Sequence, residues 1–263
     1  MCLIAFAGHT PPAFPLVLAG NRDEFHARPA APLAFDAAQG IAGGVDLQAG
    51  GRWLGLSITG RIAAVTNVRR GVPEPTRPRS RGALVDGMLR RPEPLPELFQ
   101  ALSASAGDYA RFNLIAADGQ TLCYAGNADG WHAGEVAPGL HTLSNATLDT
   151  PWPKALRLRA ALEHALDGLV DAPDDAFVEA LMSALQSRQE AEDQALPDTG
   201  IGLDRERALS PAFVALGPYG TRCSSIVLRR HDGRWWFIEQ RYAADGGPLG
   251  RTTLRGDVQG LLS

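Results

Sequence analysis

The chain has 263 residues, enough for one large domain or two small ones, and enough to bury a substantial core. Hydrophobic residues make up 45% of it, charged residues 21%, and the formal net charge is −4. This composition excludes a chain that is disordered throughout, and a weakly acidic protein has no electrostatic reason to bind nucleic acid.

The cysteines and the N-terminal residues indicate a reducing compartment. Cys2, Cys123 and Cys223 are odd in number and widely spaced, which makes a poor disulfide framework. No zinc-binding motif occurs. The N-terminus has no basic stretch, and prolines interrupt its apolar run at residues 11–12, unlike a signal peptide. No apolar run reaches the ~20 residues of a membrane helix. We therefore expect a cytoplasmic protein without a membrane span, a metal site or a cofactor.

The chain is predicted to begin with a hairpin. Residues 2–7 form an apolar run of strand length, residues 8–12 form a turn, and residues 15–19 form a second apolar run. Residues 20–25 then become polar and end this second strand. Glycine pairs at 43–44 and 50–51 are predicted to mark two loops. A second hairpin follows them, with strands at 53–58 and 61–67 and a turn at 59–60.

Blocks of helices and strands follow a loop rich in proline and arginine at residues 73–81. The predicted helices are 82–90, 95–105, 152–166 and 174–185. Strands are predicted at 112–117 and 121–124, with residues 132, 136 and 141–143 continuing their sheet, and two further strands at 223–228 and 235–240. Residues 186–202 are predicted to form a polar loop. Such blocks indicate α+β layering rather than βαβ winding. The basic clusters, Arg69 with Arg70 and Arg77 with Arg79 and Arg81, are interpreted as part of a solvated loop.

Cys2 is the first candidate for a reactive group because of its position in the chain. The initiator methionine is removable before a small residue, and its removal would leave a thiol and a free α-amine on Cys2. The α-amine has a pKa of about 8 and the thiol of about 8.5, so the amine can take the thiol proton near neutral pH. No catalytic histidine is then required. On position alone, a small buried residue in an edge strand is the favoured interpretation.

The polar segment 20–25 favours a reactive role for Cys2 over a purely structural one. It ends the second strand of the predicted hairpin, which puts its side chains beside Cys2. A buried carboxylate such as Asp23 can accept a hydrogen bond from the amine and hold it in place. A nearby Arg22 would favour the thiolate and lower its pKa. The alternative is an arginine–carboxylate pair that only closes a loop.

Two asparagines and an arginine at strand ends complete the candidate set. Asn67 and Asn145 each follow an apolar stretch, and a side-chain amide can donate to a developing oxyanion without adding charge. Turn chemistry is the alternative, and it is favoured for either residue taken alone. Arg222 precedes the apolar stretch 226–228, where it either points at a substrate, braces the N-terminal site or lies on the surface.

Together these residues resemble the NRDE family, also called the Transport and Golgi organisation family. Its motifs occur in order along the chain as Met1-Cys2, Asn21-Arg22-Asp23-Glu24, Trp53-Leu54-Gly55, Thr66-Asn67-Val68-Arg69, Leu143-Ser144-Asn145, Asp149-Thr150-Pro151-Trp152-Pro153-Lys154 and Tyr219-Gly220-Thr221-Arg222. No single motif is decisive, and the signal lies in their order and spacing. We therefore expect residues 1–263 to form a single domain of this family.

The NRDE family is similar in turn to the cysteine N-terminal-nucleophile hydrolases, such as bile-salt hydrolases and penicillin V acylases. This resemblance implies an α+β fold, a four-layer αββα sandwich. It implies that Cys2 is the nucleophile and that Asp23 holds the amine. It further implies that Asn67 and Asn145 form the oxyanion hole and that Arg222 matches an arginine near the site.

One departure from the hydrolase pattern concerns Arg22. The hydrolases carry an arginine just before their Asn-x-Asp segment, where this chain has Gly20. Arg22 lies inside the segment instead, so its side chain is not expected to take the same direction. This leaves open whether Arg22 stabilises the thiolate.

Two functions of different classes agree with these residues, and nothing in the chain favours a third, a scaffold with a degenerate site. The first is an amidohydrolase or acyltransferase that acts on a non-peptide C–N bond of a small N-acyl or amide substrate through a Cys2 thioester. The second is a non-catalytic carrier or chaperone for haem or an acyl lipid, since eukaryotic members of the family are associated with haem trafficking and lipid metabolism. None of the six histidines lies in a haem-attachment motif. We expect the enzyme.

Overall fold

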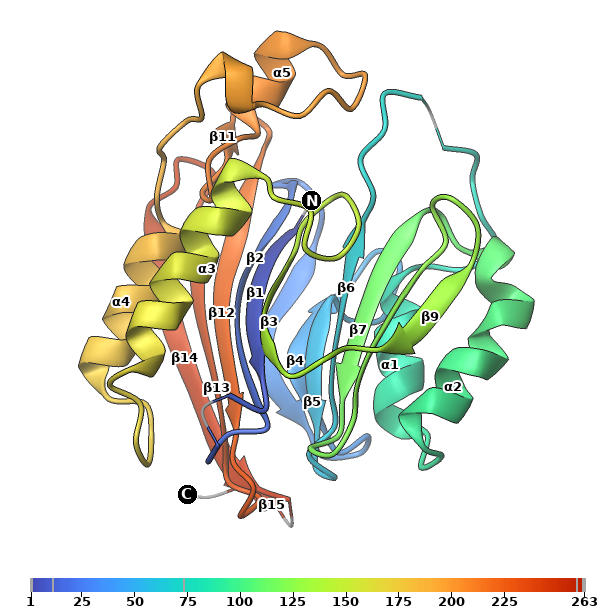
Figure 1. Cartoon of the computed structure of the whole chain (residues 1–263), viewed down its shortest axis with the longest axis vertical. Helices are drawn as coiled ribbons and strands as arrows, with labels where there is room; N and C mark the ends of the chain where they lie inside the picture. Colours follow the sequence, from blue (N-terminus) through green and yellow to red (C-terminus); the bar gives the residue numbers. More distant parts are fainter. Residues whose placement is uncertain (1, 11, 73, 259, 262–263) are drawn as a thin grey trace.

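The computed structural model describes residues 2–10, 12–72, 74–258 and 260–261. Two antiparallel sheets stack face to face, and helices cover the outer face of each sheet (Figure 1). The predicted α+β class and the four-layer αββα sandwich are therefore confirmed. No helix in the described residues is long and apolar enough to cross a membrane.

The first sheet contains both ends of the described chain. Its strand order is β10-β1-β2-β12-β13-β14-β15, and β11 pairs with β12. These strands are β1 (Cys2–Gly8), β2 (Leu16–Phe25), β10 (Gly139–Leu143), β11 (Ala215–Leu216), β12 (Tyr219–Arg229), β13 (Trp235–Tyr242), β14 (Pro248–Asp257) and β15 (Gly260–Leu261). The predicted first hairpin is β1 and β2, and β2 continues through the polar segment to Phe25.

The second sheet follows the chain from one edge to the other. Its order is β3-β4-β5-β6-β7-β8-β9. The strands are β3 (Ala30–Asp36), β4 (Ile41–Asp46), β5 (Leu54–Ser57), β6 (Ile62–Asn67), β7 (Phe112–Ala117), β8 (Leu122–Gly126) and β9 (His132–Glu135). The predicted hairpin at residues 53–67 is present as β5 and β6.

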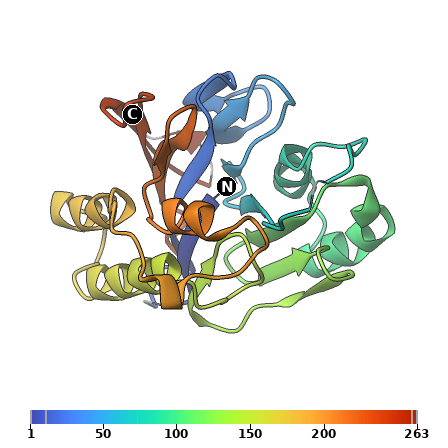
Figure 2. The same cartoon turned by 90° about the horizontal axis from the view of Figure 1, so that it is seen from above.

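Two pairs of helices form the outer layers. α1 (Gly82–Arg90) and α2 (Leu95–Leu102) pack on the second sheet, and α3 (Pro153–Leu166) and α4 (Asp175–Leu185) pack on the first. A 3₁₀ segment (Ser103–Asp108) follows α2, another (Asp193–Ala195) lies in the polar loop, and α5 (Leu203–Ala208) follows that loop. Seen from above, the N-terminal end of β1 lies between the two outer layers (Figure 2).

The apolar run at the N-terminus is explained by layers on both faces of β1. Leu3 and Ala5 pack toward α3 and α4, whereas Ile4 and Phe6 pack in the core between the two sheets. A strand that is covered on both faces needs no alternation of polar and apolar residues. A third core lies between the second sheet and α1 and α2.

Two expectations about the strands are wrong, and several strands were missed. Gly43 and Gly44 lie inside β4, not in a loop, and a side chain at Gly43 would come within 2.8 Å of the Leu54 carbonyl oxygen. Residues 141–143 belong to β10, which pairs with β1 of the first sheet instead of continuing the sheet of β8. β3, β4, β11, β14 and β15 were not predicted at all. The loop expected at 73–81 is present from residue 74, and Pro73 and Pro11 lie outside the described residues.

Candidate active site

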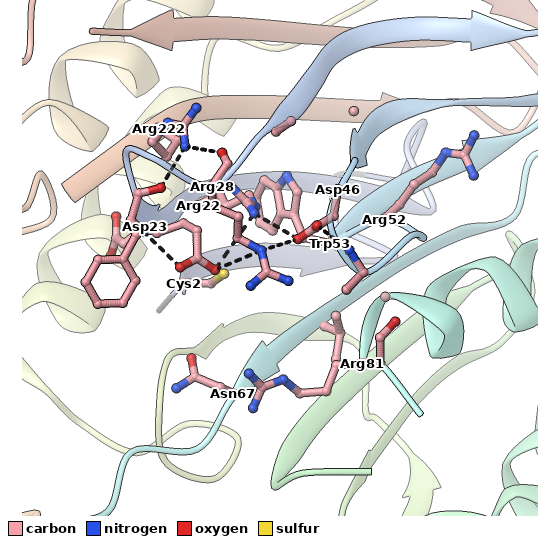
Figure 3. Close-up of a pocket in the computed structure, with 18 of the residues that line it drawn as sticks. Cys2, Arg22, Asp23, Arg28, Asp46, Arg52, Trp53, Asn67, Arg81 and Arg222 are labelled. Atoms are coloured by element: carbon pink, nitrogen blue, oxygen red, sulfur yellow. Dashed lines mark hydrogen bonds and ion pairs between the residues drawn. The ribbon is translucent and has the colours of Figure 1, made fainter. Parts of the chain in front are cut away.

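Cys2 begins β1, and its thiol faces the space between the two sheets. In the antiparallel register Cys2 lies directly opposite Arg22 of β2, and residues opposite in register share one face of a sheet. Ile4, two residues along β1 from Cys2, packs in the core between the sheets. Cys2 and Arg22 both line a cavity of about 1110 Å³ (Figure 3).

Burial determines the protonation state of the Cys2 thiol. Loss of hydration raises the thiol pKa above its ordinary value, and the carboxylates of Asp23 and Glu24 raise it further. The Arg22 guanidinium lowers this pKa, in the predicted direction, but burial outweighs it. The thiol is therefore protonated at neutral pH, and nucleophilic attack requires a base in the site.

Asp23 lies next to Arg22 on β2, and its side chain points to the opposite face of the sheet. Its carboxylate is 2% exposed and accepts a hydrogen bond from Thr221 Oγ1 over 2.7 Å. Burial raises the pKa of Asp23, while the positive charge of Lys154 and the Thr221 hydrogen bond lower it. Since Asp23 follows the residue that pairs with Cys2, its carboxylate lies at the N-terminal end of β1.

Lack of space at Gly20 explains why the arginine of this segment lies at residue 22 and not at residue 20. A side chain at residue 20 would come within 2.7 Å of the Leu3 carbonyl oxygen, so an arginine does not fit there. Residue 22 shares the face of residue 20 and lies nearer the end of the sheet. Arg22 Nη2 lies 3.4 Å from Asp46 Oδ2, which holds the guanidinium in the cavity wall.

Arg222 lies in the cavity wall, beside the turn that follows β2. It lies in a β-bulge of β12 between Thr221 and Cys223. Its Nη1 donates to the carbonyl oxygens of Phe25 and Arg28, each over 2.9 Å (Figure 3). Arg222 therefore braces the turn after β2 while it also lines the cavity.

The two candidate asparagines contact each other. Asn145 Nδ2 donates to Asn67 Oδ1 over 2.9 Å and to the Asn67 carbonyl oxygen over 3.1 Å. Ser144 Oγ donates to the Cys2 carbonyl oxygen over 3.1 Å, which ties this segment to β1. Asn67 lines the cavity, and no described residue accepts a hydrogen bond from its Nδ2. Asn145 is fully buried behind it and orients its amide.

Lys154 is a buried cation of the site that the sequence analysis missed. It is the only lysine of the chain, beside 24 arginines. Lys154 lies in the first turn of α3, and its Nζ donates to the Leu209 carbonyl oxygen over 3.0 Å. Burial lowers its pKa to about 8, although the charges of Asp23 and Cys2 act to raise it.

A signal for Lys154 was present in the sequence. Lys154, Leu158 and Leu162 follow at intervals of four residues, so the lysine lies on the apolar, buried face of α3. Leu156, in contrast, lies off this face and is 47% exposed. A lysine among core positions indicates a role for its amine, because burial of an ammonium is unfavourable unless charges accompany it.

We expect the Nζ of Lys154 to titrate with a midpoint near pH 8 instead of 10.5. Because it is the only lysine, isotope labelling of lysine yields one side-chain amine signal, which NMR can follow with pH and which Lys154→Met removes. The folded pKa lies below the unfolded one, so the unfolded chain binds more protons between these pH values. Wild-type stability should therefore rise across this window by up to about 3 kcal/mol relative to Lys154→Met. A midpoint close to 10.5 would contradict the expectation.

The interpretation of the basic clusters as a solvated loop holds only in part. Arg69 is buried, and its Nη2 lies 2.6 Å from the Glu206 carboxylate of α5. The Arg69 guanidinium also lies over the Trp152 ring, 4.5 Å from its centroid. The other cluster lies in the loop before α1 and lines the cavity with its three arginines, Arg77, Arg79 and Arg81.

Comparison with solved structures identifies the fold of this chain. A mutant conjugated bile acid hydrolase from Clostridium perfringens matches with a TM-score of 0.55, over 98% of this chain and 94% of its own, at 8% sequence identity. At that identity the likeness concerns the fold alone. The shared fold is that of the N-terminal-nucleophile hydrolases.

The chain belongs to the family called Transport and Golgi organisation 2, whose sequence pattern matches residues 1–244. It is 36% identical over 261 residues to the Transport and Golgi organization protein 2 homolog of Bos taurus, and 32% identical over 256 residues to that of Homo sapiens. Each alignment covers 91% of this chain and 92% of the relative. The family membership predicted from the NRDE segment and its flanking motifs is confirmed.

Proposed function

We propose that this protein is an N-terminal-nucleophile amidohydrolase or acyltransferase that cleaves a non-peptide C–N bond of an N-acyl or amide substrate through a thioester on Cys2. The observation that carries the proposal is that the thiol of residue 2 and the side-chain amide of Asn67 line the same cavity. The cavity volume, about 1110 Å³, lies slightly above the range typical of small-molecule sites, about 300–1,000 Å³.

The first step requires a base for the buried thiol. Removal of Met1 would free the α-amine of Cys2, which takes the proton from Sγ as the sulfur attacks the carbonyl carbon of the substrate. A C–S bond forms, and the electron pair of the C=O bond moves to oxygen. Asp23, at the N-terminal end of β1, would accept a hydrogen bond from the resulting ammonium and hold it near the sulfur.

The second step expels the amine. Asn67 Nδ2 donates to the oxyanion of the tetrahedral intermediate, and Asn145 keeps that amide in place through its own bond to Asn67 Oδ1. When the C=O bond re-forms, the C–N bond breaks, and the leaving nitrogen takes the proton held by the α-ammonium. The free amine departs, and the acyl group remains on Cys2 as a thioester.

The last step frees the enzyme. Water attacks the thioester carbon while the α-amine takes its proton, and collapse of the second tetrahedral intermediate breaks the C–S bond. The sulfur recovers the proton, and the carboxylic acid leaves. An amine or alcohol that attacks in place of water would give acyl transfer by the same sequence.

The test is the mass of the intact protein, with Met1 removed, before and after incubation with a panel of N-acyl amines and amides. We expect the mass to rise by that of one acyl group, and hydroxylamine to reverse the change because it cleaves thioesters. Cys2→Ala should abolish the adduct. Cys123→Ala is the matched control, because this buried cysteine in β8 does not line the cavity and should leave the adduct unchanged.

Two outcomes would contradict the proposal. An adduct that survives Cys2→Ala and disappears with Cys223→Ala would assign the nucleophile to the other cysteine of the cavity. A ligand retained without any adduct, as in a stoichiometric haemin complex whose Soret band depends on one histidine, would favour the carrier for haem or an acyl lipid.

A further inference from the structure

Arginines dominate the wall of the cavity, in a protein whose net charge is −4. Nine arginines and five carboxylates are among the described residues that line it; the arginines are Arg22, Arg28, Arg52, Arg77, Arg79, Arg81, Arg205, Arg222 and Arg241. Two of the carboxylates, Asp23 and Glu239, are buried, which raises the pKa of each and favours its neutral form. The cavity is therefore locally positive, and a positive cavity concentrates anionic ligands.

Most of these arginines already have partners. Arg22 and Arg28 share Asp46, and Arg52 pairs with Asp86. Arg222 donates to two backbone carbonyl oxygens, as described above. Arg241 combines two features: among the described residues it forms no ion pair, and its buried Nε has no hydrogen-bond partner. Among the same residues the Nε of Arg52 also has no partner, but Arg52 pairs with Asp86. A buried guanidinium nitrogen without a partner is unfavourable and points to a ligand that completes it.

The sheet register gives the position of Arg241 relative to the thiol. Cys2 lies opposite Arg22, Arg22 opposite Cys223, and Cys223 opposite Arg241, across β1, β2, β12 and β13. Residues opposite in register share one face, so these four side chains form a row along the cavity wall. Three strand spacings separate the ends of the row, which places Arg241 about 14 Å from Cys2 at the Cα atoms.

Glu239 is the carboxylate nearest to Arg241 along β13; burial raises its pKa and the charge of Arg241 lowers it, but the two side chains form no ion pair. It lies two residues away on the same face, and its Oε1 accepts a hydrogen bond from the Leu33 amide over 2.8 Å. On the other side, Arg241 is opposite Gly250 of β14, where a side chain would contact the Arg241 Nη2. The absence of a side chain there leaves this guanidinium room for a ligand.

We propose that the cavity takes a substrate that carries a carboxylate at the end remote from its amide, and that Arg241 binds this carboxylate. The guanidinium offers two parallel N–H donors that match a carboxylate. The inference rests on the proposed function only in placing the amide at Cys2. It adds the substrate class: half-amides of dicarboxylic acids, with a spacer that spans the row from Cys2 to Arg241.

The test measures binding to the Cys2→Ala protein, so that turnover does not interfere. The probes are the monoamide of a long-chain dicarboxylic acid, its methyl ester as the neutral control, and the analogue with a terminal phosphonate. Calorimetry should give the acid about tenfold or more tighter binding than the ester, because one charge-assisted pair is lost in the ester. Arg241→Gln should remove this difference, and Arg241→Lys should retain part of it.

Arg79→Gln is the matched control, since Arg79 also lines the cavity without an ion pair among the described residues but lies outside the row. It should preserve the preference for the acid, and thermal melting followed by circular dichroism should show that each variant folds. Equal binding of acid and ester, or the same loss in Arg79→Gln as in Arg241→Gln, would overturn the inference. Tighter binding of the phosphonate than of the carboxylate would overturn the assignment of substrate class. An acyl adduct on Cys2 without this preference would support the proposed function alone.

Discussion

A form of the protein in which a peptide bond blocks the amine of Cys2 is expected to transfer acyl groups about 10²–10⁴ times more slowly than the form that begins at Cys2. Burial raises the pKa of the thiol, so very little thiolate is present at neutral pH without a base. A peptide nitrogen is planar and does not accept a proton. No described histidine lines the cavity, so none replaces the amine at the thiol.

One polypeptide provides both forms for this measurement. An N-terminal extension that ends in a protease site, whose cleavage leaves Cys2 as the first residue, allows kcat/KM to be compared before and after cleavage. Cys2→Ala should lose the covalent intermediate in either form. Cys2→Ser should retain little activity, because a hydroxyl is far harder to deprotonate than a thiol. Equal rates before and after cleavage would end the role of the α-amine as the base.

The surroundings of Cys2 were predictable because they come from segments close in sequence. The apolar run at residues 2–7 and the polar segment at 20–25 are joined by a short turn, and their pairing alone brings Arg22 opposite Cys2. The same hairpin places Asp23 beside the end of β1. Asn67 was predictable as a strand end, since the hairpin of β5 and β6 is also local.

The other parts of the site depend on contacts between distant segments, which local patterns do not encode. Asn145 reaches Asn67 only because β10 crosses to the first sheet, whereas the sequence favoured a continuation of the second sheet. Lys154 meets Leu209, 55 residues further along the chain. Arg241 joins the row of Cys2 through two intervening strands. β4 was missed because glycines that permit close strand contacts look like loop glycines in sequence.

The buried ion pair of Arg69 and Glu206 is expected to make a large contribution to stability, because it holds α5 against the segment that contains Asn145. Its two side chains are 6% and 3% exposed, and their charged atoms lie 2.6 Å apart. The Arg69 amide also donates to the Asn145 carbonyl oxygen over 2.7 Å, so the pair holds α5 against the segment that positions Asn67. Arg69→Met leaves the Glu206 carboxylate buried without its guanidinium partner, and we expect the free energy of unfolding to fall by about 3–5 kcal/mol.

Urea unfolding measures this loss, and the slope of the free energy of unfolding against urea concentration should be the same in the variant and the wild type. Arg207→Met is the matched control from the same helix, because the pair of Arg207 with Asp193 is solvent-exposed, at 35% and 51%. Exposed pairs contribute about 0–1 kcal/mol, so the control should change stability little. The double variant Arg69→Met with Glu206→Gln should recover part of the loss, since the orphaned charge is removed with its partner. A loss in Arg69→Met no larger than in Arg207→Met would show that α5 is held by apolar packing instead, and that the pair contributes nothing to the placement of Asn145.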